Sequence, residues 1–206
     1  MKGLIQKELY NCKAVAGIAA IVLAGYALIG ANEELGIQMF SFAVTLLTIT
    51  ICLNSFSLDQ LSQFDAYALT LPISRKQLVY GKYILTILLL LCGLVLSLGA
   101  FFLWSTGQSL WQWLWSSWLP VCSFGMLLIS ILIPLVYRFG PEKSRFILLG
   151  VILLPTLGSM LLQSANMPMP SESVWNAVAS FLPAIATCAM GISCWISCRI
   201  VEKKDY

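Results

Sequence analysis

The sequence predicts an all-α, polytopic membrane protein with six transmembrane helices and both termini in the cytoplasm. Three observations support this prediction. The chain of 206 residues is 59% hydrophobic and only 10% charged, its apolar residues form six long uncharged runs, and its basic residues lie between alternate runs. Soluble domains carry about 25% charged residues, and a soluble fold of this size has too little interior to bury so much apolar surface. We therefore expect a multi-pass protein of the cell membrane.

The first expected element is an amphipathic helix over residues 1–13, MKGLIQKELYNCK. Leu4, Ile5 and Leu9 share one helical face, and Lys2 and Lys7 lie around the rest. Such a helix can lie in the plane of the inner membrane interface before the chain enters the bilayer. These five residues are the predicted interfacial anchor. A plain flanking segment that fixes the orientation is the alternative interpretation.

Six runs approach or reach the length of about 20 mostly apolar residues that a membrane-spanning helix needs. They are Ala14–Ala31, Ile37–Leu58, Tyr83–Gly107, Leu119–Tyr137, Phe146–Leu162 and Val178–Cys198. Together they predict a single transmembrane domain over residues 1–206.

The distribution of charge predicts the orientation. All 12 Lys and Arg residues precede the first run, follow the sixth, or lie in the second or fourth connection. The other three connections hold Glu33, Glu34 and Glu172 but no basic residue. Because Lys and Arg favour the cytoplasmic side, both termini are expected inside. The same separation of basic residues supports six spans, because an odd number would place basic residues on both sides of the membrane.

Tryptophans cluster around the connection between the third and fourth runs. They are Trp104, Trp111, Trp113, Trp115 and Trp118. Tryptophan favours the level of the lipid headgroups, so we expect an aromatic belt on a short interfacial helix. Contact with an amphipathic substrate is the alternative.

Several classes of function are excluded by composition. The absence of histidine rules out Ser-His and Cys-His catalysis and histidine-based metal sites. None of the seven cysteines forms a C-x-x-C pair, and no G-x-x-x-x-G-K-[ST] run is present. A net charge of +3 is too small to indicate nucleic-acid binding. We predict no catalytic residue, no metal site and no cofactor bound by this chain.

The longest inner connection, residues 59–82, reads as two helices joined by a rigid bend. Asp59 can cap a first, amphipathic helix that Pro72 ends. Ser74 and Gln77 form a capping box, which starts a second helix at Arg75 that continues into the third span. The apolar stripe of the first helix consists of Leu58, Leu61, Phe64, Tyr67, Ala68 and Leu71. A loop that only connects two spans could be a few residues long. We call residues 59–82 the elbow, and its two ordered helices indicate either a docking surface or a packed interfacial anchor.

The string YALTLPISRKQLV at residues 67–79, followed by GKYI and an apolar run, resembles the ABC-2-type permease family. In particular, it is similar to short six-span permeases of bacterial ABC exporters. The aromatic-acidic pair Phe64-Asp65, the segment Leu69–Pro72, the pair Ser74-Arg75 and the N-terminal MKGLIQKEL match that pattern. The family often has tryptophan where Phe64 stands.

The resemblance implies a transmembrane permease subunit of an ATP-driven exporter, which forms the pathway for an amphipathic substrate such as a peptide, an antibiotic or a lipid-like molecule. ATP and magnesium are then bound by a separate ABC ATP-binding subunit, expected in two copies, and the ATPase activity resides there. A second permease subunit, identical or related, is also implied.

In this family the elbow is a cytoplasmic coupling helix that docks on the ATPase. The resemblance implies apolar knobs at Phe64, Tyr67, Leu69 and Leu71. It implies polar contacts from Asp65, Arg75 and Lys76, with Pro72 and Ser74 shaping the bend.

Two other functions remain open at the level of the sequence. An autonomous secondary transporter usually keeps ionisable groups within its spans, and the six runs contain none. A non-transporting membrane immunity or assembly factor shares the same expected topology.

Overall fold

The computed structural model describes residues 2–30, 34–64, 74–104, 109–164 and 172–203, which are almost entirely helical and contain no strand. The long helices are α1 (Lys2–Gly30), α2 (Glu34–Leu61), α4 (Arg75–Trp104), α6 (Leu119–Phe139), α7 (Pro141–Ser164) and α8 (Glu172–Lys203). A short α5 (Leu110–Trp113) and a π-helical segment η1 (Leu114–Trp118) precede α6.

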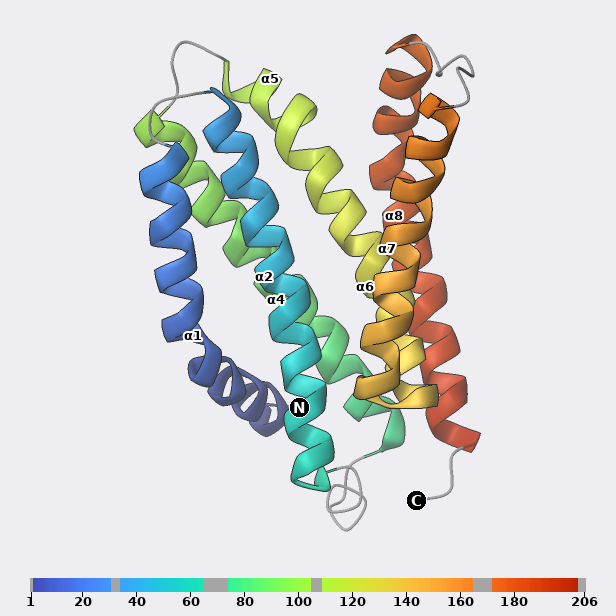
Figure 1. Cartoon of the computed structure of the whole chain (residues 1–206). Coiled ribbons are helices and arrows are strands. Elements are labelled where there is room, and N and C mark those ends of the chain that lie inside the picture. The colour runs from blue at the N-terminus through green and yellow to red at the C-terminus, as the bar shows by residue number, and fades with distance from the viewer. Residues whose placement is uncertain (1, 31–33, 65–73, 105–108, 165–171, 204–206) are drawn as a thin grey trace.

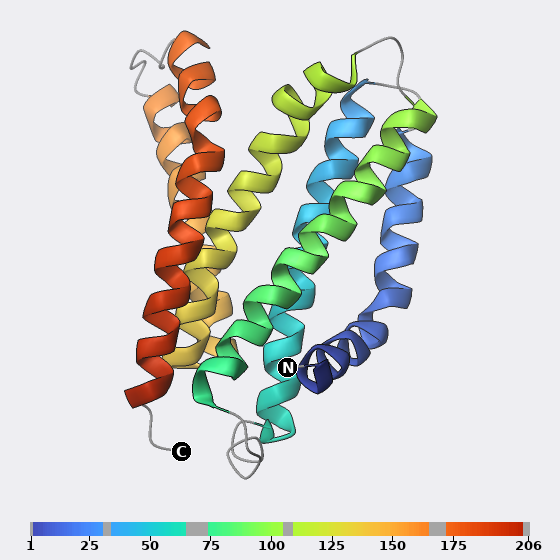
Figure 2. The same ribbon diagram turned by 180° about the vertical axis from the view of Figure 1, so that it is seen from behind.

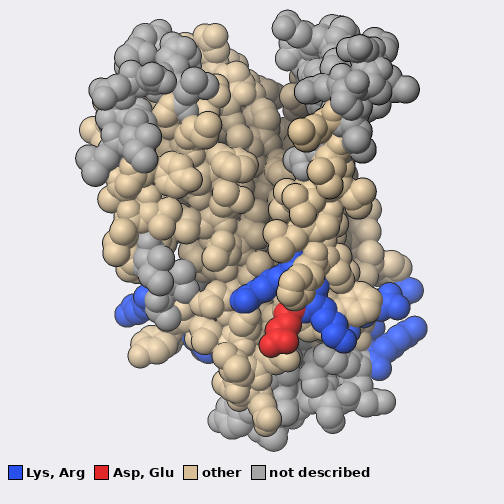
Figure 3. All heavy atoms as spheres, in the orientation of Figure 1, with Lys and Arg blue, Asp and Glu red and all other residues tan. Residues whose placement is uncertain are grey.

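The helices form two groups of three. Helices α1, α2 and α4 lie on one side of the bundle and α6, α7 and α8 on the other (Figure 1). The most extensive contact joins α6 to α8, and the two groups meet mainly through α4 with α8 and through α2 with α6. Both chain termini lie at the same end of the bundle, where Lys and Arg side chains also gather (Figure 3). We call it the basic end.

Four helices of the described part are long and apolar enough to cross a membrane. They cover Gly36–Leu61, Lys76–Leu103, Leu110–Phe139 and Val178–Lys203. With 26 to 30 residues each they are about 39–45 Å long, more than the hydrocarbon core of about 30 Å. Helices of this length can cross the hydrocarbon core with room for tilt. The fifth predicted span falls within α7, and the first falls within α1 except for Ala31, which lies outside the described residues. Six crossings and their direction remain predictions.

Helix α1 is continuous from Lys2 to Gly30, yet its first turns run across the bundle while the rest runs along it (Figure 2). The predicted interfacial segment therefore runs in a different direction from the rest of α1, at the basic end of the bundle. The side chains of Lys2, Leu4, Ile5 and Leu9 lie outside the described residues.

Helix α2 continues past the predicted end of the second span. The interpretation of Asp59 as the cap of a separate helix is wrong, because Asp59 lies inside α2 and is buried. No helix breaker separates Leu58 from Leu61, so the backbone hydrogen-bond ladder continues. The helix ends before Gln63, whose φ of 50° is left-handed. Residues 65–73, the middle of the predicted elbow, lie outside the described residues.

The predicted start of the next helix is confirmed. Ser74 N–H donates to Gln77 Oε1 at 3.1 Å, and Gln77 N–H donates to Ser74 Oγ at 3.4 Å. These reciprocal bonds are the capping box. Helix α4 then begins at Arg75 and runs without a break into the apolar sequence.

The tryptophan-rich segment is not a separate interfacial helix. It runs through the π-helical turn of η1 directly into α6, within one continuous helical stretch from Leu110 to Phe139. Trp113 is a core residue, 1% exposed, with its ring centroid 4.9 Å from that of Phe101. Trp111 and Trp115 are exposed and contact each other edge to face, as a belt requires.

The connection between α6 and α7 is a single residue. Gly140 has φ 85° and ψ 164°, a region that essentially only glycine adopts, and Pro141 begins α7. Most of the predicted inner connection at 138–145 is thus helical. On the opposite end α8 begins at Glu172, and its apolar part begins at Val178, as predicted.

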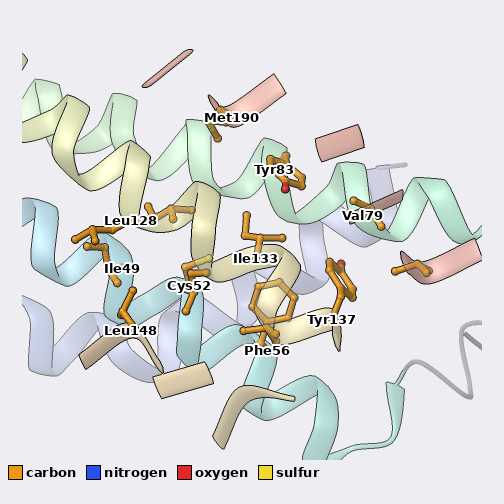
Figure 4. Close-up of a cluster of buried hydrophobic side chains, with 14 of the residues drawn as sticks. Ile49, Cys52, Phe56, Val79, Tyr83, Leu128, Ile133, Tyr137, Leu148 and Met190 are labelled. Atoms are coloured by element: carbon orange, nitrogen blue, oxygen red, sulfur yellow. The ribbon is translucent and has the colours of Figure 1, made fainter. Parts of the chain in front are cut away.

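The main core lies toward the basic end and draws on five helices. Ile49, Cys52 and Phe56 of α2 face Val79 and Tyr83 of α4 (Figure 4). Leucine, isoleucine and tyrosine side chains of α6 fill the centre, with Leu148 of α7 and Met190 of α8 at the sides. This packing fixes the relative positions of the helix ends that carry the charges.

Candidate functional site

A cluster of buried charges joins three helices at the basic end. Lys82 of α4 places its Nζ 2.8 Å from Oε1 of Glu8 on α1 and 2.6 Å from Oδ2 of Asp59 on α2. The three residues are only 3–6% exposed. Removing charges from water costs several kcal/mol per ion unless they are paired and hydrogen-bonded. These ion pairs therefore hold the beginning of α1, the end of α2 and the beginning of α4 in one arrangement.

A second lysine and a hydroxyl complete the cluster. Lys7 pairs with Asp59 and lies 3.3 Å from Oε1 of Glu8. Ser55 accepts a hydrogen bond from Lys82 at 2.6 Å and donates one to Glu8. Two ammonium groups face two carboxylates, so the cluster is neutral as a unit. We call Lys7, Glu8, Ser55, Asp59 and Lys82 the charge clamp.

Aromatic rings cover the charge clamp on two sides. Nζ of Lys7 lies 3.7 Å from the ring centroid of Phe64, and Nζ of Lys82 lies 4.7 Å from that of Phe56. Both distances are within cation–π range. A cavity of about 140 Å³ separates the clamp from Tyr137 and the turn at Gly140. The clamp is thus held between the aromatic start of the elbow and the second group of helices.

Helical periodicity places each member of the clamp. Ser55 and Asp59 are four residues apart on α2 and share one face with Phe56. Lys82 lies one turn beyond the fully buried Val79 on α4. Because residues three and four apart share a helix face, the same faces that bury the core also direct these polar groups inward.

Some of the residues predicted to dock a partner are described. Phe64 is half-buried under Lys7, and Ser74 caps α4. Lys76 is exposed and pairs with Glu202 near the end of α8 at 2.9 Å. Asp65, Tyr67, Leu69, Leu71 and Pro72, and the side chain of Arg75, lie outside the described residues.

Sequence reasoning missed most of the charge clamp. By sequence, Lys82 is only an orientation signal, Lys7 is an orientation signal and an interfacial anchor, and Glu8 has no role beyond the N-terminal pattern. A usable signal was present. Glu8 and Asp59 are two of only nine acidic residues in the chain, and each lies at the predicted cytoplasmic end of a span, where positive charge dominates.

A second polar network crosses the middle of the second helix group. Pro134 has no N–H, so the carbonyl of Ser130 loses its helical donor, and Ser193 Oγ of α8 donates to that carbonyl at 2.5 Å. Tyr83 Oη lies 2.6 Å from Ser193 Oγ and 3.1 Å from Ser197 Oγ. Since the Ser193 proton is already used, Tyr83 donates to Ser193. The network ties α4, α6 and α8 together through buried side chains.

An open cleft lies at the opposite end, between the tryptophan-rich segment and α8. It has a volume of about 420 Å³. Trp111, Trp115 and Gln112 line one side, and Ser180 and Pro183 line the other. The described lining carries no charge, which suits an amphipathic rather than an ionic ligand.

A family model described as ABC-2 family transporter protein matches residues 3–202, nearly the whole chain. No curated protein sequence matches the chain significantly.

Proposed function

Since the chain belongs to the ABC-2 transporter family, and is thus a membrane component of an ABC transporter rather than its ATPase, we propose that it is the permease subunit of an ATP-driven exporter. The observation that carries this proposal is the charge clamp. It ties both helices that flank the elbow to the N-terminal helix, immediately beside the segment whose sequence resembles that of a coupling helix. We propose that both termini and the elbow are cytoplasmic, because the basic end then follows the positive-inside rule.

The clamp provides the mechanical connection that coupling needs. Closure of a pair of ATP-binding subunits would displace the part of the elbow at residues 64–76. Two ion pairs and the shared hydroxyl prevent α4 from sliding past α1 and α2, so the displacement moves the three helix ends together. Rigid elements moving against one another are a common means of switching. The two parts that would move relative to each other are the group of α1, α2 and α4 and the group of α6, α7 and α8, which meet at the α4–α8 contact.

Two permease subunits, identical or related, would enclose the pathway, with one ATP-binding subunit beneath each. ATP and magnesium would be bound by those partners. We propose an amphipathic substrate such as a peptide, an antibiotic or a lipid-like molecule, because the outer cleft presents exposed indole rings and uncharged polar groups.

Docking is tested by reversing one charge in the elbow. We expect Asp65→Arg to lower recovery of the complex with a co-expressed ATP-binding subunit, while membrane insertion is unchanged. Glu142→Arg is the matched control, because Glu142 is an exposed acid in the first turn of α7. Equal recovery of both variants at the wild-type level would contradict the docking assignment and favour the immunity or assembly factor.

Transmission is tested separately in reconstituted complexes. We expect Glu8→Gln to preserve complex recovery but to reduce substrate-stimulated ATP hydrolysis, because it weakens the clamp without touching the elbow. Glu142→Gln serves as the control. If Glu8→Gln leaves the stimulation unchanged, the clamp does not transmit motion, although the permease assignment itself stands.

Orientation is tested in a cysteine-free background. A single cysteine at position 33 should react with an impermeant thiol reagent in intact cells, and one at position 76 should not. The opposite pattern would reverse the topology.

A further inference from the structure

An open groove runs along the surface of the bundle between α6 and α8, beside the contact of these two helices. It has a volume of about 450 Å³. Its walls are apolar, with Ile131 and Leu135 from α6 opposite Ile192 and Ile196 from α8. Arg138, in the last turn of α6, closes it at the basic end. No function assigned above uses this groove.

Arg138 differs from the lysines described above. Lys7, Lys76 and Lys82 each pair with a carboxylate, whereas no carboxylate of the described residues forms an ion pair with Arg138. Its guanidinium is exposed and lies 5.2 Å from the ring centroid of Phe139. The ring leaves the N–H groups of the guanidinium available to an external anion.

The combination of a cation and an apolar groove matches one class of ligand. Ser130 and Arg138 mark the two ends of the α6 wall, about 12 Å apart along the helix. An acyl chain fits beside such a wall, and a phosphate forms short, charge-assisted hydrogen bonds with a guanidinium. Basic pockets between transmembrane helices bind anionic headgroups in this way.

We propose that the groove between α6 and α8 is a binding site for an anionic phospholipid. The phosphate accepts hydrogen bonds from Arg138, and one acyl chain lies between the isoleucines of the two helices. The proposal requires only that the chain lies in a membrane, so it stands or falls independently of coupling to an ATPase.

Native mass spectrometry of the purified full chain tests the site. The probes are phosphatidylglycerol and phosphatidylcholine with identical acyl chains, added in equal amounts. We expect the wild type to retain phosphatidylglycerol about fivefold more than phosphatidylcholine. Arg138→Gln should remove this preference, and Arg138→Lys should keep most of it. Lys143→Gln is the matched control, because it removes an exposed positive charge from the same end but outside the groove.

A second variant tests the apolar part. Ile192→Trp fills the groove, and we expect it to lower the retention of both lipids. The proposal is overturned if Arg138→Gln keeps the preference, or if Lys143→Gln loses it equally, since the effect is then one of general charge. It is also overturned if Ile192→Trp retains both lipids but dissociates a dimer, because the groove is then an interface between copies. Circular dichroism and gel filtration establish that each variant is folded.

Discussion

Replacing Lys82 with methionine removes the cation that two buried carboxylates share. Lys82 lies 2.8 Å from Glu8 and 2.6 Å from Asp59, and it also donates to Ser55 at 2.6 Å. Methionine retains much of the length of the side chain, so little cavity forms. What remains is one ammonium group, from Lys7, facing two carboxylates. Lys82→Met therefore leaves a net negative charge on two carboxylates that are only 3% and 6% exposed.

The magnitude follows from the burial of the pairs. Breaking a buried ion pair by removing one partner costs about 3–5 kcal/mol, and we expect Lys82→Met to lower the free energy of unfolding by that amount. Lys76→Met is the control on the same helix. Its pair with Glu202 is exposed, with side chains 54% and 46% accessible, and exposed pairs contribute about 1 kcal/mol or less.

The assay is reversible unfolding of the purified protein in mixed micelles of a mild detergent and dodecyl sulfate, followed by circular dichroism. Adding Asp59→Asn to Lys82→Met restores a neutral pair of Lys7 and Glu8. The two changes should therefore be non-additive by about 1–3 kcal/mol. The reasoning is refuted if Lys82→Met costs no more than Lys76→Met, or if the two changes in the clamp simply add.

Three further predictions concern single sites, and each is measured by the same unfolding assay. Ser193→Ala leaves the carbonyl of Ser130 without its donor and removes one of the two serine partners of the Tyr83 hydroxyl, so we expect a loss of about 1–3 kcal/mol; an unchanged stability would contradict this. Gly140→Ala forces a β-carbon into a left-handed conformation, at a cost of about 1–3 kcal/mol, and an unchanged stability would mean that the turn rearranges. Ser74→Ala removes one half of the capping box and should cost about 1 kcal/mol, with faster amide hydrogen exchange in the first turn of α4; unchanged exchange would mean that the cap contributes nothing.

The beginning of α4 was predictable because its determinants are local. Ser74 and Gln77 are three residues apart, and their reciprocal hydrogen bonds need only the first turn of a helix. The helical nature of the apolar runs was predictable for a related reason, since a lipid environment leaves the backbone few alternatives to the helix.

Other features were mispredicted because local rules were outweighed by tertiary contacts. Asp59 follows an apolar run and is a good helix cap by sequence, yet it lies within α2 because Lys82 and Lys7 neutralise it. Trp113 belongs to a tryptophan-rich segment typical of the headgroup level, yet it packs against Phe101. In both cases the partner comes from another helix.

The sequence by itself determined that this chain is a bundle of long apolar helices, that its positive charges gather at one end, and that α4 starts at Arg75 behind the capping box of Ser74 and Gln77. Each of these follows from composition or from neighbours in the sequence. Only the tertiary structure decided which charges are buried together. Lys7 and Asp59 are 52 residues apart, and Tyr83 and Ser193 are 110 apart. Whether such groups meet depends on how the helices pack, because a buried charge is tolerated only where that packing supplies its counter-charge.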